Sequence, residues 1–343
     1  MDLNQRLAGG VVIPAHPLAL DENGAIDLRA QRAVTRYQLA AGAHGLAVGV
    51  HTTQFELHDD RGALREVWAL AAETARESGR SPILVAGLTG DVAQAVAEAQ
   101  LAVELGYEAA LLSPWGMSER TEATLLKRAA AVGEVIPTIG FYLQDSVGGL
   151  HLSRNYWRAL FDLESVVAVK TAPFDRYRTG DVLQTLLAHD RWRDVAVLTG
   201  NDDAIVHDLL TPYRAWIGGE QREVRATGGL LGQWAVGTRA AVDLVTTATA
   251  AVADELVPVD LLADASALVE VNAAVFDVAH DFAGCVPGVN EVLRQQGLVP
   301  TARCLGTDVL SPGQAELITE VRRRYPDLLD EEFVAVNRHT WLS

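Results

Sequence analysis

Two polar residues that end apolar runs have the types and the spacing to carry chemistry together. Tyr142 ends the run at 136–142, and Lys170 ends the run at 166–170, 28 residues further on (170 − 142 = 28). One strand, one helix and a return loop need about that much chain, so we expect both residues at equivalent ends of adjacent parallel strands. A phenol and an amine that meet there can act as a proton carrier and as a nucleophile toward a carbonyl group.

Each of the two residues also has an explanation without chemistry. A buried ammonium costs free energy, so Lys170 either pairs with a carboxylate or has a lowered pKa and becomes a nucleophile. A lysine that only reaches solvent from a strand end is the commoner case when nothing else is known. Tyr142 can equally be a core residue whose hydroxyl bonds to backbone.

Other polar and glycine residues follow the later apolar runs. Asn201, Asp202 and Asp203 come after the run at 195–199 and can bind substrate hydroxyls or a metal, although such a cluster more often caps a helix. Gly228 and Gly229 let a ligand approach the backbone, and equally allow a tight strand end. The nine histidines are scattered without metal-ligand spacing, so we expect no metal site.

The elements that must position these residues alternate along the chain. Apolar runs of strand type occur at 10–14, 45–50, 81–88, 109–113, 138–143, 166–171, 195–199 and 224–230, with helical patterns between them. Eight such strands predict a closed (β/α)8 barrel, with an open doubly wound sheet as the alternative. After residue 233 only helical segments remain, at 235–251, 259–278, 288–296 and 311–324. We therefore expect a barrel domain over residues 1–234 and a C-terminal helical region over residues 235–343.

Composition excludes several functions. Hydrophobic residues make up 49% of the chain but aromatic residues only 6%, which is typical of aliphatic parallel strands covered by helices. The net charge of −17 argues against binding to nucleic acid or to an anionic membrane. The two cysteines, Cys285 and Cys304, form no spaced ligand pair, and no signal-like or membrane-spanning run is present. The expectation is a protein of the cytoplasm.

Several of these segments together resemble one enzyme family over about residues 10–300. They are Phe141-Tyr142-Leu-Gln-Asp-Ser-Val-Gly-Gly149, Val-Val-Ala-Val-Lys170, Thr199-Gly-Asn-Asp-Asp203 and Gly228-Gly229. The sequence resembles the dihydrodipicolinate synthase and N-acetylneuraminate lyase family of class I aldolases. The resemblance implies a (β/α)8 barrel with C-terminal helices, commonly in a tetramer, with a dimer as the other oligomer we consider.

The resemblance also implies a reaction. Lys170 would form a Schiff base with pyruvate or another 2-oxo acid, and Tyr142 would be the acid/base that moves protons as a C–C bond forms or breaks or a hydroxyl leaves. An aldehyde is the expected second reactant, and this chemistry needs no cofactor. We expect cleavage, condensation or dehydration.

The loop Gly49-Val50-His51-Thr52-Thr53 departs from the family pattern. The two adjacent threonines that bind the substrate carboxylate in the family fall here on Val50 and His51. Thr52 and Thr53 supply the hydroxyls if the loop shifts, or His51 binds the carboxylate or carries a proton. The alternative is a histidine that only holds the loop in place.

Two further departures concern the second substrate. The arginine that the synthases place five residues after the tyrosine is Val147 here, and the tyrosine that a neighbouring subunit contributes is replaced by Trp115 and Gly116. Dihydrodipicolinate synthesis itself is therefore not expected. Trp115, Val147 and Trp234 favour a less acidic or more hydrophobic second substrate.

Two rival functions remain open at this point. A 2-keto-3-deoxy sugar acid dehydratase or aldolase requires that Thr52, Thr53 and Asn201 line the pocket and meet sugar hydroxyls. A member without turnover, which binds a 2-oxo acid for regulation, is suggested by the missing threonine pair and arginine.

Overall fold

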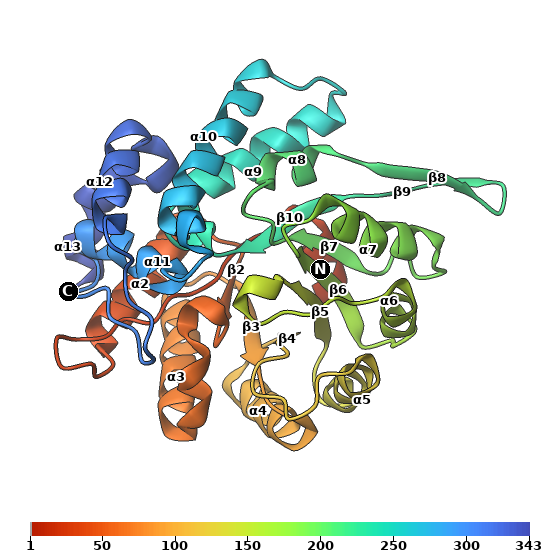
Figure 1. Cartoon of the computed structure of the whole chain (residues 1–343), viewed down its shortest axis with the longest axis horizontal. Coiled ribbons are helices and arrows are strands. Elements are labelled where there is room, and N and C mark those ends of the chain that lie inside the picture. The colour runs from red at the N-terminus through yellow and green to blue at the C-terminus, as the bar shows by residue number, and fades with distance from the viewer. Residues whose placement is uncertain (1) are drawn as a thin grey trace.

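Eight parallel strands close into a barrel in the computed structural model, which describes residues 2–343 (Figure 1). The strands are β1 Val12–Pro14, β2 Gly45–Val48, β3 Ile83–Leu88, β4 Ala109–Leu112, β5 Thr138–Leu143, β6 Val166–Ala172, β7 Ala196–Thr199 and β10 Ala226–Leu231. They pair in the order β1-β10-β7-β6-β5-β4-β3-β2. The His44 N–H donates to the Val12 carbonyl at 2.9 Å, and the His16 N–H donates to the Ala47 carbonyl at 2.8 Å, which joins β1 to β2. The predicted barrel is confirmed.

Helices cover the outside of this barrel. They are α2 Leu28–Ala40, α3 Arg61–Glu77, α4 Val92–Leu105, α5 Glu122–Gly133, α6 Arg154–Phe161, α7 Arg176–Ala188, α8 Ile205–Leu210 and α9 Thr238–Ala253. A short helix, α1 Leu3–Ala8, precedes β1 and places the fully buried Leu7 with the residues of the barrel interior. The expected boundary after residue 234 falls just before α9, which packs with α8 and β1 in the place of the eighth barrel helix.

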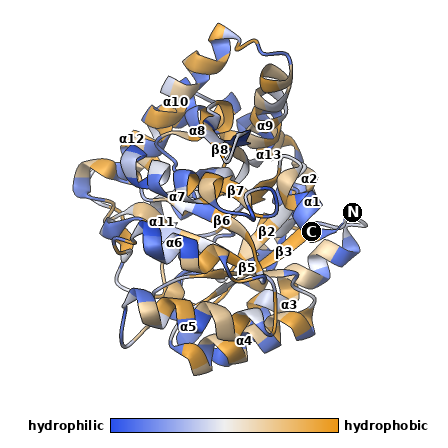
Figure 2. Ribbon diagram, turned by 90° about the vertical axis from the view of Figure 1, so that its right-hand side faces the viewer, coloured by the Kyte–Doolittle hydropathy of each residue, from blue (hydrophilic) through white to orange (hydrophobic). Residues whose placement is uncertain are grey.

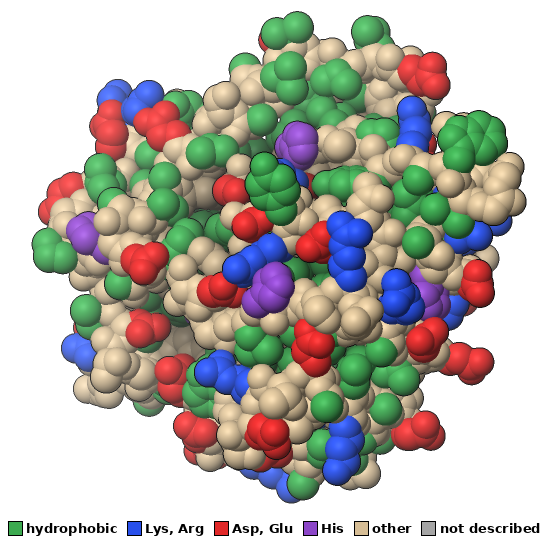
Figure 3. Space-filling model, turned by 45° about the vertical axis from the view of Figure 1, so that its right-hand side comes forward, with side chains coloured by type: hydrophobic (Ala, Val, Ile, Leu, Met, Phe, Trp, Pro, Cys, Tyr) green, Lys and Arg blue, Asp and Glu red, His purple; other side chains and the backbone are tan. Residues whose placement is uncertain are grey.

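The strands have two buried faces, as their uninterrupted apolar sequences require. In β6, Ala168 belongs to the barrel interior, whereas Val169 belongs to the layer between strands and helices. In Figure 2 the central strands are mainly hydrophobic in colour, and the helices carry both colours because one face of each is solvent-exposed. Acidic and basic side chains are interspersed over the face drawn in Figure 3, so the negative net charge is not gathered there.

A hairpin between α8 and β10 was not expected from the sequence. Its strands, β8 Tyr213–Ile217 and β9 Glu220–Val224, pair antiparallel and extend away from the barrel in Figure 1. Gly218 and Gly219 form its two-residue turn with φ values of 59° and 84°, a conformation that favours glycine. The strand predicted at 224–230 therefore starts later, because Val224 belongs to the hairpin.

The C-terminal region contains four more helices. They are α10 Val259–Val275, α11 Cys285–Gln295, α12 Gln314–Arg324 and α13 Glu331–Trp341. The first three correspond to predicted helices, and α13 was not predicted. Together with α2 they enclose a second apolar core, in which the Tyr37 hydroxyl donates to Asp330 Oδ2 at 2.6 Å. None of the helices in residues 2–343 has the length and apolar character needed to cross a membrane.

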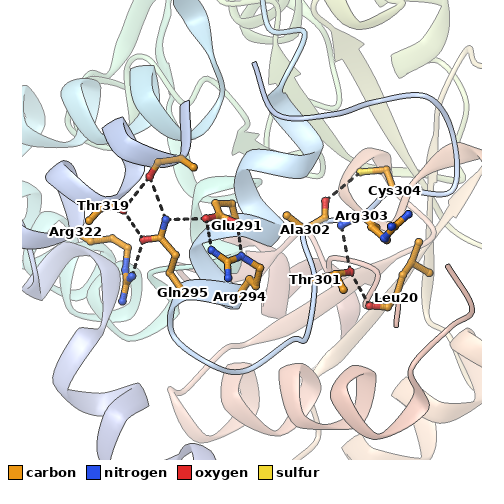
Figure 4. A network of polar contacts seen from close by, with 11 residues as sticks. Leu20, Glu291, Arg294, Gln295, Thr301, Ala302, Arg303, Cys304, Thr319 and Arg322 are labelled. Carbon is orange, nitrogen blue, oxygen red and sulfur yellow. Dashed lines mark hydrogen bonds and ion pairs between the residues drawn. The ribbon is translucent and has the colours of Figure 1, made fainter. Parts of the chain in front are cut away.

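Polar contacts fasten this region to the loops at the mouth of the barrel (Figure 4). Within it, Glu291 accepts from Arg294 at 2.6 Å and from Gln295 at 2.8 Å, and Arg322 donates to Gln295 at 2.8 Å. The connection between α11 and α12 then reaches the barrel, where the Thr301 hydroxyl donates to the Leu20 carbonyl at 2.9 Å. The last of these contacts holds the segment that follows α11 against the loop after β1.

Candidate active site

A cavity opens at the carboxyl ends of the barrel strands, and Lys170 reaches into it from β6. Its volume is about 690 Å³, counting the opening to solvent. The methylene chain of Lys170 passes over Gly200, where a Cβ atom would lie only 2.4 Å from Lys170 Cε. The ammonium lies 4.5 Å from the centre of the Phe141 ring. Gly200 therefore leaves the space that lets the lysine enter the cavity.

The surroundings of Lys170 favour its neutral form. Burial lowers the pKa of this amine from 10.5 to about 8, and the charge of Asp202 opposes that shift. Among residues 2–343, no carboxylate lies within 4.0 Å of the ammonium. Burial without a close ion-pair partner gives more free amine near neutral pH than an ordinary lysine has. This is the state that a nucleophile toward a carbonyl group requires.

Tyr142 does not share the cavity, and the prediction that it faces the mouth is wrong. Thr138 pairs with Val166, an offset of 28 residues (166 − 138 = 28), but Phe141 pairs with Lys170, an offset of 29 (170 − 141 = 29). The register shifts because β6 carries one extra residue, Val167, at an irregularity. A shift of one residue moves every side chain to the other face of its strand. Phe141 thus stands beside the lysine, and Tyr142 points to the helices.

In its actual position Tyr142 is a core residue. Its ring lies 5.3 Å from the ring of Trp157, and its hydroxyl accepts a hydrogen bond from the Leu152 N–H at 3.4 Å. Burial raises the pKa of the phenol. This geometry supports the alternative in which Tyr142 is a core residue whose hydroxyl bonds to the backbone.

The loop after β2 contributes Val50, His51 and Thr52 to the cavity lining. Burial, and then the charge of Lys170, lower the pKa of His51 to about 4, so its imidazole is neutral at neutral pH. The Thr52 hydroxyl donates to the Ala15 carbonyl at 2.8 Å. The Thr53 hydroxyl donates to the His16 carbonyl and accepts from the Gly49 N–H at 3.0 Å, away from the cavity. Both hydroxyls hold the loop against the end of β1.

A buried pair behind the loop adds to this support. His58 Nδ1 lies 3.0 Å from Glu98 Oε1, and His58 Nε2 lies 2.8 Å from the Gly49 carbonyl oxygen. Gly49 itself packs against Trp68, where a Cβ atom would lie 2.7 Å from the indole nitrogen. Gly49 is therefore a packing position and not a part of the cavity wall.

The segment after β7 differs from the expectation in a second way. Asn201 is fully buried outside the cavity, where its side-chain oxygen accepts from the Phe174 N–H at 3.0 Å and its nitrogen donates to Asp208 at 2.9 Å. Asp202 lines the cavity instead. The helix cap is Ala204, so capping does not explain these residues. The sequence analysis had placed Asn201 among the substrate-binding residues, whereas its neighbour Asp202 is the residue that lines the cavity.

Asp202 is placed to exchange a proton near neutral pH. Its Oδ1 accepts from the Gln233 N–H at 3.1 Å. Burial raises the pKa of this carboxyl to about 7, although the Gln233 hydrogen bond and the charge of Lys170 oppose the shift. Both protonation states are then populated at neutral pH, as a general acid and base needs. No group of three or more His, Cys, Asp or Glu side chains suited to a metal ion occurs within residues 2–343.

Gly228 and Gly229 are packing positions of β10. A Cβ atom on Gly228 would lie 2.2 Å from the Val11 carbonyl oxygen, and one on Gly229 would lie 2.7 Å from the Thr199 carbonyl oxygen. The tight strand end explains both glycines, and neither lines the cavity.

The residues expected to shape an apolar mouth divide between two places. Val147 lines the cavity, and Trp115 stacks on the cavity residue Phe55 at 5.6 Å between ring centres. Trp234 is fully buried in the core formed by α8 and α9. Trp234 is therefore excluded from the mouth.

Comparison with known proteins agrees with this barrel. A sequence profile of the Dihydrodipicolinate synthetase family matches residues 9–222, more than half of the chain. The chain belongs to this family. A 4-hydroxy-tetrahydrodipicolinate synthase from an Exiguobacterium species is 27% identical over 197 residues, which is 57% of this chain and 62% of that relative. The matched stretch thus spans less than two thirds of the relative.

Solved structures of the dihydrodipicolinate synthetase family share the fold. N-acetylneuraminate lyase from Fusobacterium nucleatum has a TM-score of 0.72 at 17% identity, with 93% of this chain and 99% of that chain covered. A prophage protein of the dihydrodipicolinic acid synthase family from E. coli K12, in complex with pyruvate, has a TM-score of 0.74 at 16% identity, with 92% and 98% covered. At these identities the likeness establishes the fold alone. Family members include lyases and synthases of the class I aldolase type.

Proposed function

We propose that this protein is a Schiff-base lyase or aldolase whose Lys170 condenses with pyruvate or another 2-oxo acid. The observation that carries the proposal is a buried amine at the carboxyl end of β6, with a pKa lowered to about 8 and an open cavity in front of it. The composition strengthens the argument. The chain has two lysines and 26 arginines (28 − 2 = 26), so basic positions in this sequence are nearly always arginine. A lysine at position 170 therefore supports a role that needs the amine itself.

The reaction begins when the neutral Lys170 amine attacks the keto carbon of the 2-oxo acid. Loss of water from the adduct gives an imine, which accepts electrons as a proton leaves the neighbouring carbon to form an enamine. The enamine carbon then attacks an aldehyde, or the reverse steps cleave a C–C bond. Each step requires a group that gives and then takes a proton.

Asp202 fills this role in the proposal, because Tyr142 points away from the cavity and Phe141, which has no hydroxyl, stands beside the lysine. Protonated Asp202 gives its proton to the departing hydroxyl, which leaves as water. The resulting carboxylate then removes a proton from the carbon next to the imine. A carboxyl with a pKa of about 7 serves both steps near neutral pH.

The carboxylate of the 2-oxo acid is proposed to lie against the loop that contains Val50, His51 and Thr52. A neutral His51 donates one N–H to the carboxylate, and its pKa of about 4 argues against a role as a cationic proton carrier. Of the three residues that a sugar acid would need, Thr53 and Asn201 lie outside the cavity, and the Thr52 hydroxyl is already bonded. This arrangement disfavours the 2-keto-3-deoxy sugar acid reaction.

Borohydride reduction in the presence of pyruvate tests the proposal. The expected result is a stable adduct on the peptide that contains Lys170, found by mass spectrometry, and none on Lys127, the other lysine of the chain. Lys127 is solvent-exposed and serves as an internal control. Absence of an adduct at Lys170 with pyruvate and with a panel of 2-oxo acids would refute the proposal. An adduct without turnover of any aldehyde would favour the alternative function, in which the protein binds a 2-oxo acid for regulation and catalyses no reaction.

Tyr142→Phe is expected to leave the rate of imine formation within about 2-fold of the unaltered protein, because its hydroxyl faces Leu152 and not the cavity. The free energy of unfolding should fall by about 1 kcal/mol or less, since one long hydrogen bond is lost. Reduction kinetics and urea denaturation measure the two quantities. A loss of about 100-fold or more in imine formation would show that the phenol carries protons after all.

A further inference from the structure

The wall of the cavity is rich in phenylalanine, although the chain as a whole is poor in aromatic residues. Five of the seven phenylalanines of the chain line the cavity, namely Phe55, Phe141, Phe174, Phe276 and Phe282. Leu111, Leu143 and Val147 extend the apolar surface. The concentration of rings in one place indicates selection for an apolar, ring-shaped occupant next to the lysine.

The charges in the wall point the same way. Among the residues that the structure describes, no arginine lines the cavity, the one lysine there is the proposed nucleophile, and Asp202 is the one carboxylate. A reactant that brought a second carboxylate would meet Asp202 and find no cation to pair with. Burial of an unpaired charge is strongly unfavourable. The second reactant should therefore be an aldehyde that carries no charged group.

Two of the rings are held in a backbone conformation that phenylalanine rarely adopts. Phe174, in the loop after β6, has φ of 52°, and Phe282, just before α11, has φ of 67°. Hydrogen bonds hold both, from the Phe174 N–H to Asn201 at 3.0 Å and from the Phe282 N–H to the Asp277 carbonyl at 3.1 Å. Strained backbone kept in place by surrounding bonds is typical of sites that position a ligand.

The strain brings these two rings together at the cavity. Their centres are 5.7 Å apart and their planes make an angle of 72°, the edge-to-face arrangement that aromatic rings prefer. One ring comes from the barrel and the other from the C-terminal region. The pair forms an aromatic corner to which a third ring can add in the same geometry.

We propose that the second reactant is an uncharged aromatic aldehyde whose ring packs against Phe174 and Phe282. This inference rests on the proposed function. The enamine carbon formed from pyruvate on Lys170 bonds to the aldehyde carbon, and the aldehyde oxygen takes a proton from Asp202. Water then hydrolyses the imine, which frees the lysine and releases a 4-aryl-4-hydroxy-2-oxo acid. In the reverse direction the same steps release pyruvate and the aryl aldehyde.

The cavity is open to solvent, so an aldehyde can approach a pyruvate that is bound to the lysine. Val147 lies in the wall at the position where the synthases have an arginine. The positive charge that would bind an acidic aldehyde is therefore absent from this position.

The test compares three aldehydes in condensation with pyruvate. Benzaldehyde should exceed cyclohexanecarbaldehyde in kcat/KM by roughly 2- to 12-fold, because a ring gains edge-to-face contacts that a saturated ring lacks. It should exceed 4-carboxybenzaldehyde by about 100-fold or more, because the added charge has no partner. Loss of aldehyde is followed by absorbance and product formation by mass spectrometry.

Variants connect the preference to the aromatic corner. Phe282→Leu and Phe174→Leu should each bring the ratio of benzaldehyde to cyclohexanecarbaldehyde close to 1. Phe333→Leu is the matched control, because Phe333 lies in the second core against Tyr37 and Trp341. It should leave the ratio unchanged, and thermal unfolding of all three variants verifies that they fold.

The outcomes separate this inference from the proposed function. If the pyruvate adduct forms on Lys170 but the charged or the saturated aldehyde is preferred, or no aldehyde reacts, the aromatic substrate is refuted and the Schiff base stands. If no 2-oxo acid forms an adduct, both fail. An unchanged ratio in the folded Phe282→Leu and Phe174→Leu variants also overturns the role of the corner.

Discussion

Lys170→Met is expected to abolish adduct formation with pyruvate and to lower kcat/KM for condensation by about 10⁴-fold or more, as removal of a covalent nucleophile does. Methionine keeps an unbranched chain that can occupy the space over Gly200, so the cavity should retain its shape. Borohydride trapping and the condensation assay measure the loss. Because every later step proceeds through the imine on Lys170, no pH should restore the activity.

The same substitution should stabilise the fold. A lysine whose pKa is 10.5 in the unfolded chain and about 8 in the folded protein binds its proton less well after folding, so it destabilises the protein below pH 8. Removal of the amine should raise the free energy of unfolding by about 1–3 kcal/mol at pH 7. The gain should shrink as the pH rises from about 8 to 10.5, where both states lose the proton. Urea denaturation across this range measures it.

Lys127→Met is the control for both effects. Lys127 is exposed on α5, so its loss should change neither the adduct nor the pH dependence of stability. Retention of adduct formation in Lys170→Met would place the imine on another amine and contradict the proposed mechanism.

Asp202→Asn is expected to slow the proton transfers by about 10² to 10⁴-fold, while an imine still accumulates because water can protonate the departing hydroxyl more slowly. The amide oxygen can still accept from the Gln233 N–H, so the local structure should survive. Exchange of the pyruvate methyl protons with deuterated water reports enamine formation, and borohydride trapping reports the imine. A split between the two readouts is the signature of a residue that carries protons.

The pH profile of the Asp202→Asn protein should shift as well. The Asp202 charge raises the pKa of Lys170, so its removal lowers that pKa further below about 8. The midpoint for imine formation should therefore move to lower pH. In the unaltered protein, exchange should also need Asp202 in its ionised form and thus weaken as the pH falls through about 7.

Asp203→Asn is the matched control, because Asp203 is the exposed neighbour that does not line the cavity. It should change the exchange rate by less than about 3-fold, since its charge acts on Asp202 only through space. Exchange at the unaltered rate in Asp202→Asn would show that His51 or water carries the proton instead.

The local pattern of the sequence was sufficient for most of the fold. The eight strands and the helices α2 to α7 and α9 to α12 were predicted, because each buried strand is a short apolar run and each of these helices has its own periodicity. The helices α1, α8 and α13 were not predicted. The hairpin of β8 and β9 was missed. Its strands are exposed and rich in charge, so they lack the apolar run by which the other strands were found.

Only part of the candidate site could be predicted from the sequence. Lys170, Val50 and His51 line the cavity, whereas Thr53 and Asn201 have their polar groups bonded elsewhere. Which hydroxyl or amide remains free depends on partners far away in the sequence. That information is not present in the residues next to it.

Tyr142 and Lys170, the pair that the sequence singled out for chemistry, show which features the sequence can predict and which it cannot. The sequence by itself determined that both residues end adjacent strands of a (β/α)8 barrel and that the lysine reaches the mouth. Only the tertiary structure decided which side chain of β5 accompanies it, because one extra residue at Val167 shifts the register and turns Phe141 inward. The face of a strand depends on its pairing with a neighbour. Spacing along the chain cannot specify it.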